Sequence, residues 1–324
     1  MFDNGCEWLR CDFHLHTRKD KEFKYSGEEH SFVNDYISSL ENSNIKIGLI
    51  TNHNKFDLNE YKALKKAASK KNIFILPGVE LSVKDGKNSV HTLIIFNPED
   101  WIQNGENHIN NFLTAAFQGI NNRENENTCC NYDLNTLLVE LEKLNKDYFI
   151  VFAHIEQKSG LIEECGGGRL SSLASNHEFK KRVLGLQKLR TKDNIKKIKD
   201  WFGYEVAFVE GSDPKKLEEI GKGKETYIKI GEYSFNALKY ALQDYKNRIS
   251  DELPKINHGY INSISFKGGK LDSMKIPFSN ELNTLIGIRG SGKSSVLESI
   301  RYALDLNANI DKDYKDNLVK NTLG

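Results

Sequence analysis

Short apolar runs alternate with helical patterns along residues 1–230, and this alternation limits the fold more than any other feature of the sequence. Helical patterns occupy 57–71, 132–145 and 192–202. The apolar runs predict seven strands, at 11–16, 45–51, 73–76, 90–96, 148–153, 183–187 and 205–210. Such alternation predicts an α/β fold with a mainly parallel sheet or a closed barrel, and with helices outside it. Functional sites in these folds gather at the C-terminal ends of the strands.

Composition excludes whole classes of protein. The 324 residues include 46 Lys and Arg against 45 Asp and Glu, so any contact with nucleic acid has to be local rather than driven by overall basic charge. We expect no membrane partner and no secretory signal, because the sequence has no run of 18 apolar residues and no apolar N-terminal region. The five cysteines include no C-x-x-C pair, which favours a reduced, cytoplasmic location.

The remaining segments suggest how the chain is divided. Residues 101–131 are rich in Asn and predict a helix followed by an irregular insertion, and the glycine cluster 166–168 predicts a mobile loop. Residues 234–249 predict a helix that begins after an N-cap at Ser234. The stretch 250–258 contains Pro254 and predicts a linker. We therefore expect one domain over 1–254 and a second over 255–324.

Histidines and carboxylates recur at or near the predicted strand ends. His14 and His16 are two residues apart in a strand, so their imidazoles project from the same face. The other positions of this kind are His53, Glu80, His91, His154 and Asp213. A barrel would bring these side chains to one mouth, where five imidazoles and two carboxylates favour Zn²⁺, Mn²⁺ or Fe²⁺ over Ca²⁺. Glu80 could bridge two metals about 3.5–4 Å apart, an arrangement suited to phosphoryl displacement. The alternative is a set of structural histidines.

These segments resemble successive motifs of the polymerase-and-histidinol-phosphatase (PHP) family. The matching stretches are CDFHLHT at 11–17, ITNHN at 50–54, PGVELS at 77–82, His91, AH at 153–154 and GSD at 211–213. The resemblance covers roughly residues 8–230. It implies a distorted (β/α)7 barrel that holds two or three divalent metals, and phosphomonoesterase or nuclease chemistry by a metal-bound hydroxide.

The resemblance also implies a set of ligands. The family has a carboxylate soon after its His-x-His pair; we choose Asp20, with Glu28 and Glu29 as alternatives. The implied metal ligands are His14, His16, Asp20, His53, Glu80, His91, His154 and Asp213. The implied catalytic set is His14, His16, His53, Glu80, His154 and Asp213, and we add Lys215, which departs from the family pattern, as a candidate for holding the substrate phosphate.

The sequence departs from the family pattern at two places. Asn52 stands where the family usually has Asp, which removes a charge behind the ligands but no ligand. Pro214 and Lys215 follow Asp213 where the family usually has Ala-His. A protonated Lys has three donors and no acceptor, so Lys215 cannot replace an imidazole. Either one metal position is weakened or Lys215 holds the substrate phosphate. The nine Lys and Arg of 180–199 could likewise follow a phosphate backbone, although a solvated helix face is the commoner explanation.

The second domain contains a phosphate-binding motif. GIRGSGKS at 287–294 fits G-x-x-x-x-G-K-[ST], between an expected apolar strand at 282–286 and an expected helix that buries Val296, Leu297, Ile300 and Leu304. Backbone N–H groups of such a loop surround phosphates, the Lys reaches the β and γ oxygens and the Ser binds Mg²⁺. The motif predicts ATP and Mg²⁺ bound by Gly287, Gly290, Ser291, Gly292, Lys293, Ser294 and Ser295. The alternative is a glycine turn before a helix.

The sequence around this motif, ISF at 264–266 and LIGIRGSGKSSVLESI at 285–300, resembles the start of an ABC-type ATPase head of the chromosome-maintenance (SMC) kind. Residues 295–324 leave no room for a Walker B strand, a coiled coil or a signature motif. We therefore expect a partial P-loop lobe that does not hydrolyse ATP by itself, and whose remainder comes in cis or in trans. The order of barrel and head is similar to PHP–ATPase fusions of the TrlF type.

These patterns predict a metal-dependent phosphoesterase, specifically a nuclease acting on DNA or RNA, regulated by an ATP-binding head in genome defence or DNA repair. One alternative is a small-molecule phosphomonoesterase of the histidinol-phosphatase kind. Another, motivated by Asn52 and Lys215, is a degenerate barrel that serves as a binding or regulatory module. The sequence leaves homo-oligomerisation open.

Overall fold

The structure, a computed structural model, describes residues 2–103, 105–307 and 311–323. Contacts divide the chain into two compact units: Trp8–Pro254 forms the large unit, and Lys255 onward together with the segment before Trp8 forms the small unit. Among the described residues, no helix combines the length and the apolar character that crossing a membrane requires.

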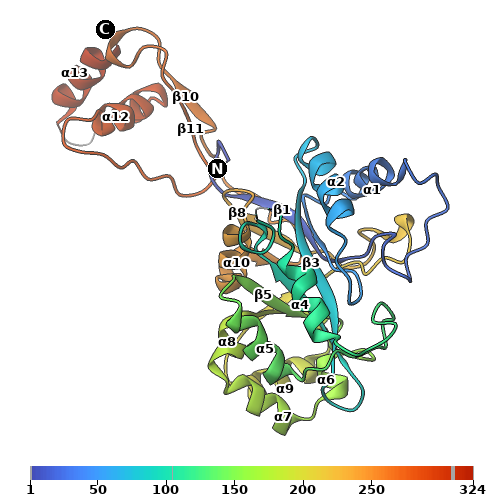
Figure 1. Cartoon of the computed structure of the whole chain (residues 1–324). Helices are drawn as coiled ribbons and strands as arrows, with labels where there is room; N and C mark the ends of the chain where they lie inside the picture. Colours follow the sequence, from blue (N-terminus) through green and yellow to red (C-terminus); the bar gives the residue numbers. More distant parts are fainter. Residues whose placement is uncertain (1, 104, 308–310, 324) are drawn as a thin grey trace. The chain divides into compact units, whose positions relative to one another are not determined.

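A nine-stranded sheet forms the centre of the large unit (Figure 1). The strands follow one another in the spatial order β7-β6-β5-β4-β3-β2-β1-β8-β9. Their bounds are β1 (Glu7–Leu15), β2 (Ile47–Ile50), β3 (Phe74–Val83), β4 (Val90–Phe96), β5 (Tyr148–Phe152), β6 (Val183–Gln187), β7 (Ala207–Val209), β8 (Tyr227–Ile230) and β9 (Ile249–Ser250). Strands β1–β7 therefore occupy the regions in which the sequence predicts strands.

The sheet curls until the chain after β7 returns to β1. The N–H of Phe13 donates to the carbonyl oxygen of Glu210 at 3.4 Å, and the N–H of Asp213 donates to that of His14 at 2.9 Å. Strands β1–β7 thus form a nearly closed, barrel-like sheet, which confirms the predicted α/β barrel in its coarse form. The closure also brings the two ends of the barrel sequence, around residues 14 and 213, into direct contact.

The sheet is mixed rather than uniformly parallel. The pairs β1–β2, β2–β3, β5–β6 and β6–β7 are parallel, whereas β4 runs antiparallel to both β3 and β5. The amino end of β4 consequently lies beside the carboxyl ends of its neighbours. This reversal places His91, the second residue of β4, at the same edge as the residues that follow the other strands.

Strand β3 is much longer than the predicted 73–76, because Pro77 and Gly78 do not end it. It pairs with β2 as far as Pro77 and with β4 from Gly78 onward. A Cβ on Gly78 would lie 2.7 Å from Cδ1 of Ile95 and 2.9 Å from the carbonyl oxygen of Ile94, so glycine permits the close approach of β4. Glu80, expected after a short strand, therefore lies inside a long one.

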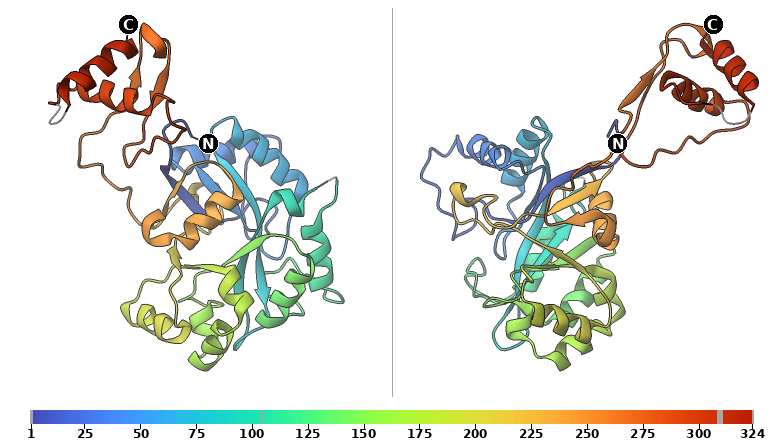
Figure 2. Two further views of the ribbon diagram at one scale, coloured as in Figure 1. Left: turned by 90° about the vertical axis from the view of Figure 1, so that its left-hand side faces the viewer. Right: turned by 180° about the vertical axis from the view of Figure 1, so that it is seen from behind.

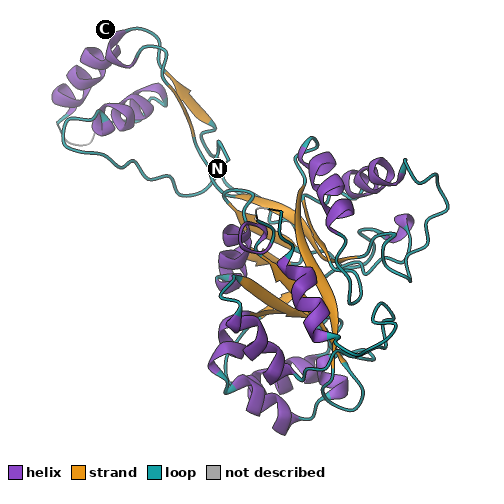
Figure 3. Ribbon diagram, viewed as in Figure 1, coloured by secondary structure: helices purple, strands orange, loops and turns teal. Residues whose placement is uncertain are grey.

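Helices lie on the outside of the sheet (Figures 1, 2 and 3). Their bounds are α1 (Phe32–Asn42), α2 (Leu58–Ser69), α3 (Pro98–Trp101), α4 (His108–Ala116), α5 (Leu134–Lys143), α6 (Leu161–Glu164), α7 (Gly167–Ala174), α8 (His177–Arg182), α9 (Lys192–Phe202), the 3-10 turn η1 (Leu217–Glu219), α10 (Phe235–Gln243) and α11 (Tyr245–Arg248). Helices α2, α5 and α9 confirm the three helical patterns found in the sequence.

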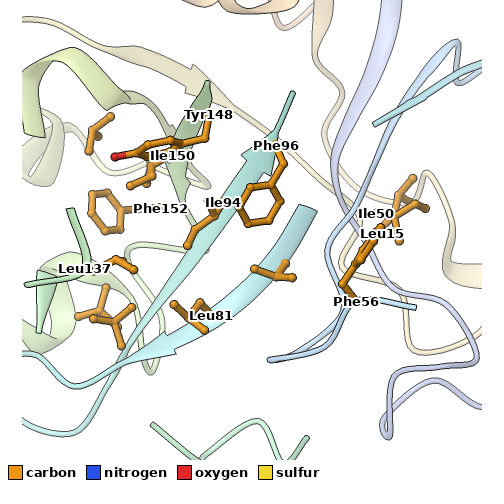
Figure 4. Packing of buried hydrophobic residues seen from close by; sticks show 14 of the residues in the cluster. Leu15, Ile50, Phe56, Leu81, Ile94, Phe96, Leu137, Tyr148, Ile150 and Phe152 are labelled. Atoms are coloured by element: carbon orange, nitrogen blue, oxygen red, sulfur yellow. The ribbon is translucent and has the colours of Figure 1, made fainter. Parts of the chain in front are cut away.

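The core fills the space between the sheet and these helices (Figure 4). Alternate residues of the central strands, such as Leu81, Ile94 and Phe152, are fully buried, as are Leu137 and Leu141 on one face of α5. The side chain of Ser234 caps α10 by accepting a hydrogen bond from Ala237 N–H at 3.0 Å, as the sequence predicts. Burial of this apolar surface holds the strand ends in place.

Two further sequence predictions about secondary structure in the large unit are wrong. The glycine cluster 166–168 is not a loop: Gly166 caps α7, and a Cβ on Gly167 would lie 2.4 Å from Nε1 of Trp201, so glycine serves close packing there. The predicted helix over 234–249 is divided into α10 and α11, and its last residue, Ile249, pairs in β9.

The small unit contains β10 (Ser263–Ser265), the turn η2 (Gly269–Leu271), β11 (Lys275–Pro277), α12 (Lys293–Ala303) and α13 (Lys312–Leu323). Strands β10 and β11 pair as an antiparallel hairpin. The expected strand at 282–286 is absent from the described structure, and Leu282 and Ile286 are 90% exposed. A buried strand needs neighbours on both sides, which the described residues of this unit do not supply.

The helix after the phosphate-binding motif is present, but its buried face is smaller than predicted. Helix α12 begins at Lys293, directly after Gly292 in a left-handed conformation with φ +88°. Val296 is buried and Ile300 is partly buried, whereas Leu297 and Leu304 are exposed. The predicted apolar face is therefore only partly covered by described residues.

A charge cluster on the outside of the barrel yields a stability prediction. Arg182 is 8% exposed, and its guanidinium donates to Glu142 at 2.6 Å and to Asp147 at 2.6 Å and lies over the ring of Tyr148. Burial alone would raise the pKa of Glu142, but hydrogen bonds from Arg182 outweigh it and lower the pKa to about 2. We expect Arg182→Ala to lower the free energy of unfolding by about 2–3 kcal/mol in urea denaturation, less than for a fully buried pair because both carboxylates are partly exposed.

The neighbouring Lys181 provides a matched control. Its ammonium also contacts Glu142, at 3.3 Å, but it is 45% exposed. Exposed ion pairs contribute little, so Lys181→Ala should change the free energy of unfolding by roughly 0.5 kcal/mol or less. Equal effects of the two substitutions would contradict the assignment of Arg182 as a buried anchor.

Candidate metal centre

The structure brings seven of the predicted site residues together at one edge of the barrel. His14 and His16 come from the end of β1, His53 follows β2, Glu80 lies in β3, and His91 begins β4. His154 follows β5 and Asp213 follows β7. The five imidazoles and Glu80 are buried, and the side chain of Asp213 is 20% exposed. Residues separated by up to 199 positions thus line one site.

The carboxylate of Glu80 lies at the centre of this site and faces all five imidazoles. Its Oε2 lies 2.7 Å from Nε2 of His14, 3.4 Å from that of His16 and 3.0 Å from that of His53. Its Oε1 lies 2.9 Å from Nδ1 of His91 and 3.3 Å from Nε2 of His154. The two oxygens therefore face two different groups of histidines, as a carboxylate that bridges two cations would.

Asp213 occupies the mouth of the site together with Lys215. Its Oδ1 lies 3.0 Å from Nε2 of His16 and 3.9 Å from that of His14. The ammonium of Lys215 lies 3.1 Å from the same Oδ1 and 2.5 Å from Glu22. Burial alone would lower the pKa of Lys215, but Asp213 and Glu22 outweigh it and raise the pKa. Lys215 therefore stays a donor, and the structure places it at the site but not as a ligand.

Asp20 lies behind the histidines rather than among the facing nitrogens. Its Oδ2 lies 3.1 Å from Nδ1 of His16 and 2.9 Å from Nδ1 of His53, while Nε2 of each ring points to Glu80. The position differs from the expected ligand position because the chain turns back after Thr17, where Asp20 N–H donates to the Thr17 carbonyl. Asp20 thus holds the ring of His53 by a hydrogen bond and lies within ion-pair distance of Nδ1 of His16. Its rivals from the sequence, Glu28 and Glu29, are exposed and pair with His30 and Arg18.

The residues present fit divalent metal ions. Three groups have ligand atoms that all lie within 4.8 Å of one another: His14–His16–Asp213, His16–His53–Glu80 and Glu80–His91–His154. Nε2 of His91 and Nδ1 of His154 are buried and have no hydrogen-bond partner among the described residues. Unpaired polar atoms are costly in a protein interior unless a further group satisfies them. The mixture of imidazole and carboxylate suits Zn²⁺, Mn²⁺ or Fe²⁺.

The neighbouring groups favour an ionised Glu80 carboxylate and a protonated His16. Burial alone would raise the pKa of Glu80, but the neighbouring His14, His53 and His91 outweigh it and keep the pKa well below its usual range. Burial lowers the pKa of His14. For His16, burial acts in the same direction, but hydrogen bonds to Asp20 and Asp213 prevail and raise the pKa to about 9. A buried carboxylate that stays ionised among imidazoles is a typical metal ligand.

The backbone at two of these positions is strained. His154 and Asp213 have φ angles of 24° and 53°, in the left-handed region that side-chain-bearing residues avoid. The buried Asp12 secures the second turn: it accepts from the N–H of His14 at 3.1 Å and from the N–H of Ser212 at 3.0 Å. The structure thus maintains these turns where their side chains reach the site.

Three residues that reasoning from the sequence missed, Gln187, Glu22 and Glu126, also contribute to this region, together with Lys188 from the basic stretch 180–199. Gln187, at the end of β6, contacts His14, and the partly buried Lys188 lies 3.8 Å from Asp213. Glu22 and Glu126 form a further group with His53 whose ligand atoms lie within 4.8 Å of one another. Gln187 is the last residue of the predicted strand 183–187, and its position at a strand end was the available signal in the sequence. Glu126 lies in the irregular insertion, where no pattern marks it.

The irregular insertion is attached to the site by Asn54, which follows His53. The Asn54 side-chain amide donates to the carbonyl oxygens of Arg123 at 2.9 Å, Asn125 at 3.2 Å and Thr128 at 3.0 Å. Its Oδ1 accepts from Ser82 N–H at 2.9 Å. The insertion therefore forms part of the wall of the centre.

The predicted nucleotide-binding residues lie together in the small unit. The ammonium of Lys293 donates to the carbonyl oxygens of Gly287 at 2.7 Å and Ile288 at 2.8 Å, and lies 3.4 Å from Oγ of Ser291. Gly290 and Gly292 have φ angles of 83° and 88°, which glycine adopts readily. Ser294 and Ser295 lie in the first turn of α12. The motif thus forms a turn that leads into a helix, and nucleotide binding stays a prediction.

Comparison with known proteins identifies the fold. No protein-family model and no curated protein sequence matches the chain. Among solved structures, the chain is similar to a two-domain protein from Bacteroides vulgatus that contains a predicted PHP-like metal-dependent phosphoesterase. The TM-score is 0.51 at 12% identity, and the match covers 77% of this chain and 66% of that one. PsfC from Pseudomonas syringae matches with a TM-score of 0.45 at 14% identity, over 75% of this chain and 91% of that one.

The Bacteroides vulgatus structure shows that the chain has the fold of a PHP-like protein, in agreement with the motifs in the sequence. The match says nothing of a nucleotide-binding head. That the small unit belongs to an ABC- or SMC-type ATPase therefore stays a prediction from its sequence.

The central position of Glu80 predicts how metal content responds to mutation. We expect Glu80→Gln to reduce bound metal to less than half of the wild-type content after loading with Mn²⁺ or Zn²⁺, because the amide removes the charge that faces both groups of histidines. Elemental analysis of the purified protein measures this. Glu164→Gln is the matched control, since Glu164 is also buried but accepts from backbone N–H groups of Asn88 and Ser159. Equal metal content in the wild type and Glu80→Gln would contradict the role of Glu80.

Proposed function

We propose that this protein is a divalent-metal-dependent phosphoesterase. The observation that carries the proposal is the buried Glu80 carboxylate, whose two oxygens face five imidazoles from four segments of the barrel. The residues that would hold metal are His14, His16, His53, Glu80, His91, His154 and Asp213. Bound divalent cations would polarise a phosphoryl oxygen and make water a stronger nucleophile near neutral pH.

The chain's own residues would bind and orient the phosphate at the mouth. Lys215 and Lys188 both lie beside Asp213, with ammonium-to-carboxylate distances of 3.1 Å and 3.8 Å. Lys215 is 36% exposed, so its ammonium can exchange one carboxylate contact for a phosphate oxygen. Asp20 and Asp12 would keep the histidine rings and the Ser212 turn in position while substrate binds. A positive charge from lysine beside the metal ligands suits an anionic phosphoester.

We further propose that the substrate is a nucleic acid, DNA or RNA, and that the protein is a nuclease. The support is the P-loop motif in the same chain, because a small-metabolite phosphatase has little use for an ATP-binding lobe. Lys192, Lys196 and Lys197 on α9 offer an exposed or partly exposed basic segment that could contact a phosphate backbone. The setting that this combination favours is cytoplasmic genome defence or DNA repair.

Removal of metal ligands tests the phosphoesterase proposal. We expect His14→Ala/His16→Ala to reduce Mn²⁺-dependent cleavage by at least about 100-fold, since metal catalysis supplies several kcal/mol of transition-state stabilisation. The control is His30→Ala/His177→Ala, which removes two imidazoles that are more than 80% exposed. Cleavage retained by the first double variant in a nuclease-free preparation would count against the site.

The choice of substrate separates the proposal from its alternatives. Labelled single- and double-stranded DNA and RNA should be cleaved, while p-nitrophenyl phosphate should be hydrolysed slowly. Brisk turnover of p-nitrophenyl phosphate without cleavage of nucleic acid would favour a small-molecule phosphatase. Less than one metal per chain under metal-replete conditions would favour a degenerate barrel with a regulatory role.

We also propose that the small unit binds ATP with Mg²⁺ and regulates the barrel, together with the remainder of an ATPase head in cis or in trans. The residues that would bind the nucleotide are Gly287, Gly290, Ser291, Gly292, Lys293, Ser294 and Ser295. In support of this, α12 begins at Lys293 and directs its N-terminal N–H groups toward the loop, as anion binding requires.

Loss of the P-loop lysine tests nucleotide binding. Lys293→Ala should weaken binding of Mg²⁺-ATP by roughly 10-fold or more, because its ammonium would contact the β and γ phosphates. Equilibrium binding of a fluorescent ATP analogue measures this, and Lys312→Ala on α13 is the control. Equal affinity for the wild type and Lys293→Ala would contradict the proposed nucleotide site.

A further inference from the structure

We propose that Gln187 is a positioning residue of the metal centre, which fixes a proton on Nδ1 of His14 and thereby reserves Nε2 of His14 for a cation. The proposal rests on the metal centre described above and deepens it. Gln187 is the last residue of β6 and is fully buried. As an amide it is not among the implied ligands, and none of the matching stretches in the sequence includes it.

The Gln187 side chain connects three segments that carry site residues. Its Oε1 lies 3.0 Å from Nδ1 of His14 and accepts from the N–H of His154 at 3.2 Å. Its Nε2 donates to the carbonyl oxygen of Gly211 at 3.3 Å. The carbonyl oxygen of Gln187 also accepts from the N–H of Ile155 at 3.0 Å. One side chain thus contacts β1, the strained turn at His154 and the turn that leads to Asp213.

Two backbone groups determine which way the amide points. The N–H of His154 can only donate, so it requires the amide oxygen, and the carbonyl of Gly211 can only accept, so it requires the amide nitrogen. The oxygen therefore also faces Nδ1 of His14. Since an amide oxygen has no proton to give, Nδ1 of His14 has to donate, which places its proton on that nitrogen.

This proton position has a consequence for the opposite side of the ring. Nε2 of His14 lies 2.7 Å from Oε2 of Glu80. Because Nδ1 carries the proton, Nε2 of a neutral His14 presents a lone pair to the carboxylate oxygen of Glu80. These two acceptor atoms repel each other at this distance unless a positive charge lies between or beside them. Gln187 thereby makes the pair of His14 and Glu80 a binding place for a cation.

His14 is oriented in the same way as His16 and His53, but the acceptor behind its Nδ1 is a neutral amide instead of a carboxylate. Asp20 contacts Nδ1 of both His16 and His53, so all three rings have an acceptor behind them and direct Nε2 to Glu80. At His14 the acceptor is neutral, and this avoids a further buried anion close to Glu80 and Asp213. Groups that orient metal-binding histidines in this way affect metal affinity strongly.

The packing around Gln187 leaves no room for another side chain that would make the same contact with His14. A Cβ on Gly211 would lie 2.8 Å from Nε2 of Gln187 and 2.7 Å from Cβ of His14, so glycine leaves space for both side chains. Gln187 is enclosed between β1 and the turn before Asp213. A shorter side chain at 187 would withdraw the oxygen from His14, and an apolar one would leave buried polar groups unpaired.

The first experiment observes the proton directly in the wild-type protein. Long-range ¹H–¹⁵N correlation spectra of histidine-labelled protein, assigned with His14→Asn, report which ring nitrogen carries hydrogen. We expect Nδ1 of His14 to be protonated before and after addition of Zn²⁺. A neutral His14 with its proton on Nε2, in either state, would overturn the proposal whether or not the protein proves to be a phosphoesterase.

The second experiment measures metal binding with Co²⁺, whose visible absorption reports both affinity and coordination. Gln187→Leu should raise the dissociation constant roughly 10- to 100-fold and alter the spectrum, as is typical of lost supporting contacts. Gln187→Glu keeps an acceptor for His14 and His154 but loses the donor to the Gly211 carbonyl and adds a buried anion, so its affinity should lie between those of the wild type and Gln187→Leu. Thr226→Val is the control, because buried Thr226 accepts from the N–H of Glu210 but contacts none of these histidines.

The outcomes separate this inference from the proposed function. If the wild type binds Co²⁺ and Gln187→Leu binds it equally well with the same spectrum, Gln187 has no positioning role. If Gln187→Leu does not fold, Gln187→Asn replaces it, since that residue keeps the amide but shortens its reach to His14. Absence of Co²⁺ binding by the wild type would refute the metal centre and this inference with it, whereas a proton on Nε2 of a neutral His14 would refute the inference alone.

Discussion

The burial of one carboxylate, that of Glu80, is the constraint on which the rest of the large unit depends. A buried anion without compensation would cost several kcal/mol even after the protein relaxes around it. Here five imidazoles compensate it, and they come from β1, the chain after β2, the start of β4 and the chain after β5. The strand ends must therefore converge, and the curled sheet is the arrangement that achieves this.

The position of Glu80 within β3 makes the centre rigid. Before Pro77 the strand is paired with β2, and from Gly78 onward with β4. The carboxylate consequently belongs to continuous sheet and not to a loop, while most of the residues that face it lie at strand ends. Behind those residues lie Asp12, Asp20 and Gln187, which accept hydrogen bonds from the backbone or from Nδ1 atoms. The site thus has a fixed centre and oriented surroundings, as preorganised catalysis requires.

The sequence predicted the barrel and the seven converging side chains because both follow from local patterns: apolar runs mark strands, and polar residues after them mark one edge. It did not predict the direction of β4, because the alternation of residues within a strand is the same for either direction. It ended β3 too early, because Pro77 and Gly78 usually interrupt strands. The position of Asp20 behind the rings and the contact of Gln187 with His14 depend on tertiary geometry, and no spacing in the sequence encodes them.

The contacts of Asn54 change how the irregular insertion should be regarded. Without regular secondary structure after α4 and rich in asparagine, the segment resembles the most dispensable part of the chain. Yet three of its carbonyl groups converge on a single amide adjacent to His53. The contacts with Asn54 therefore constrain the length of the insertion. A shorter or longer segment between Asn122 and Thr128 would open one side of the metal centre while leaving the barrel intact.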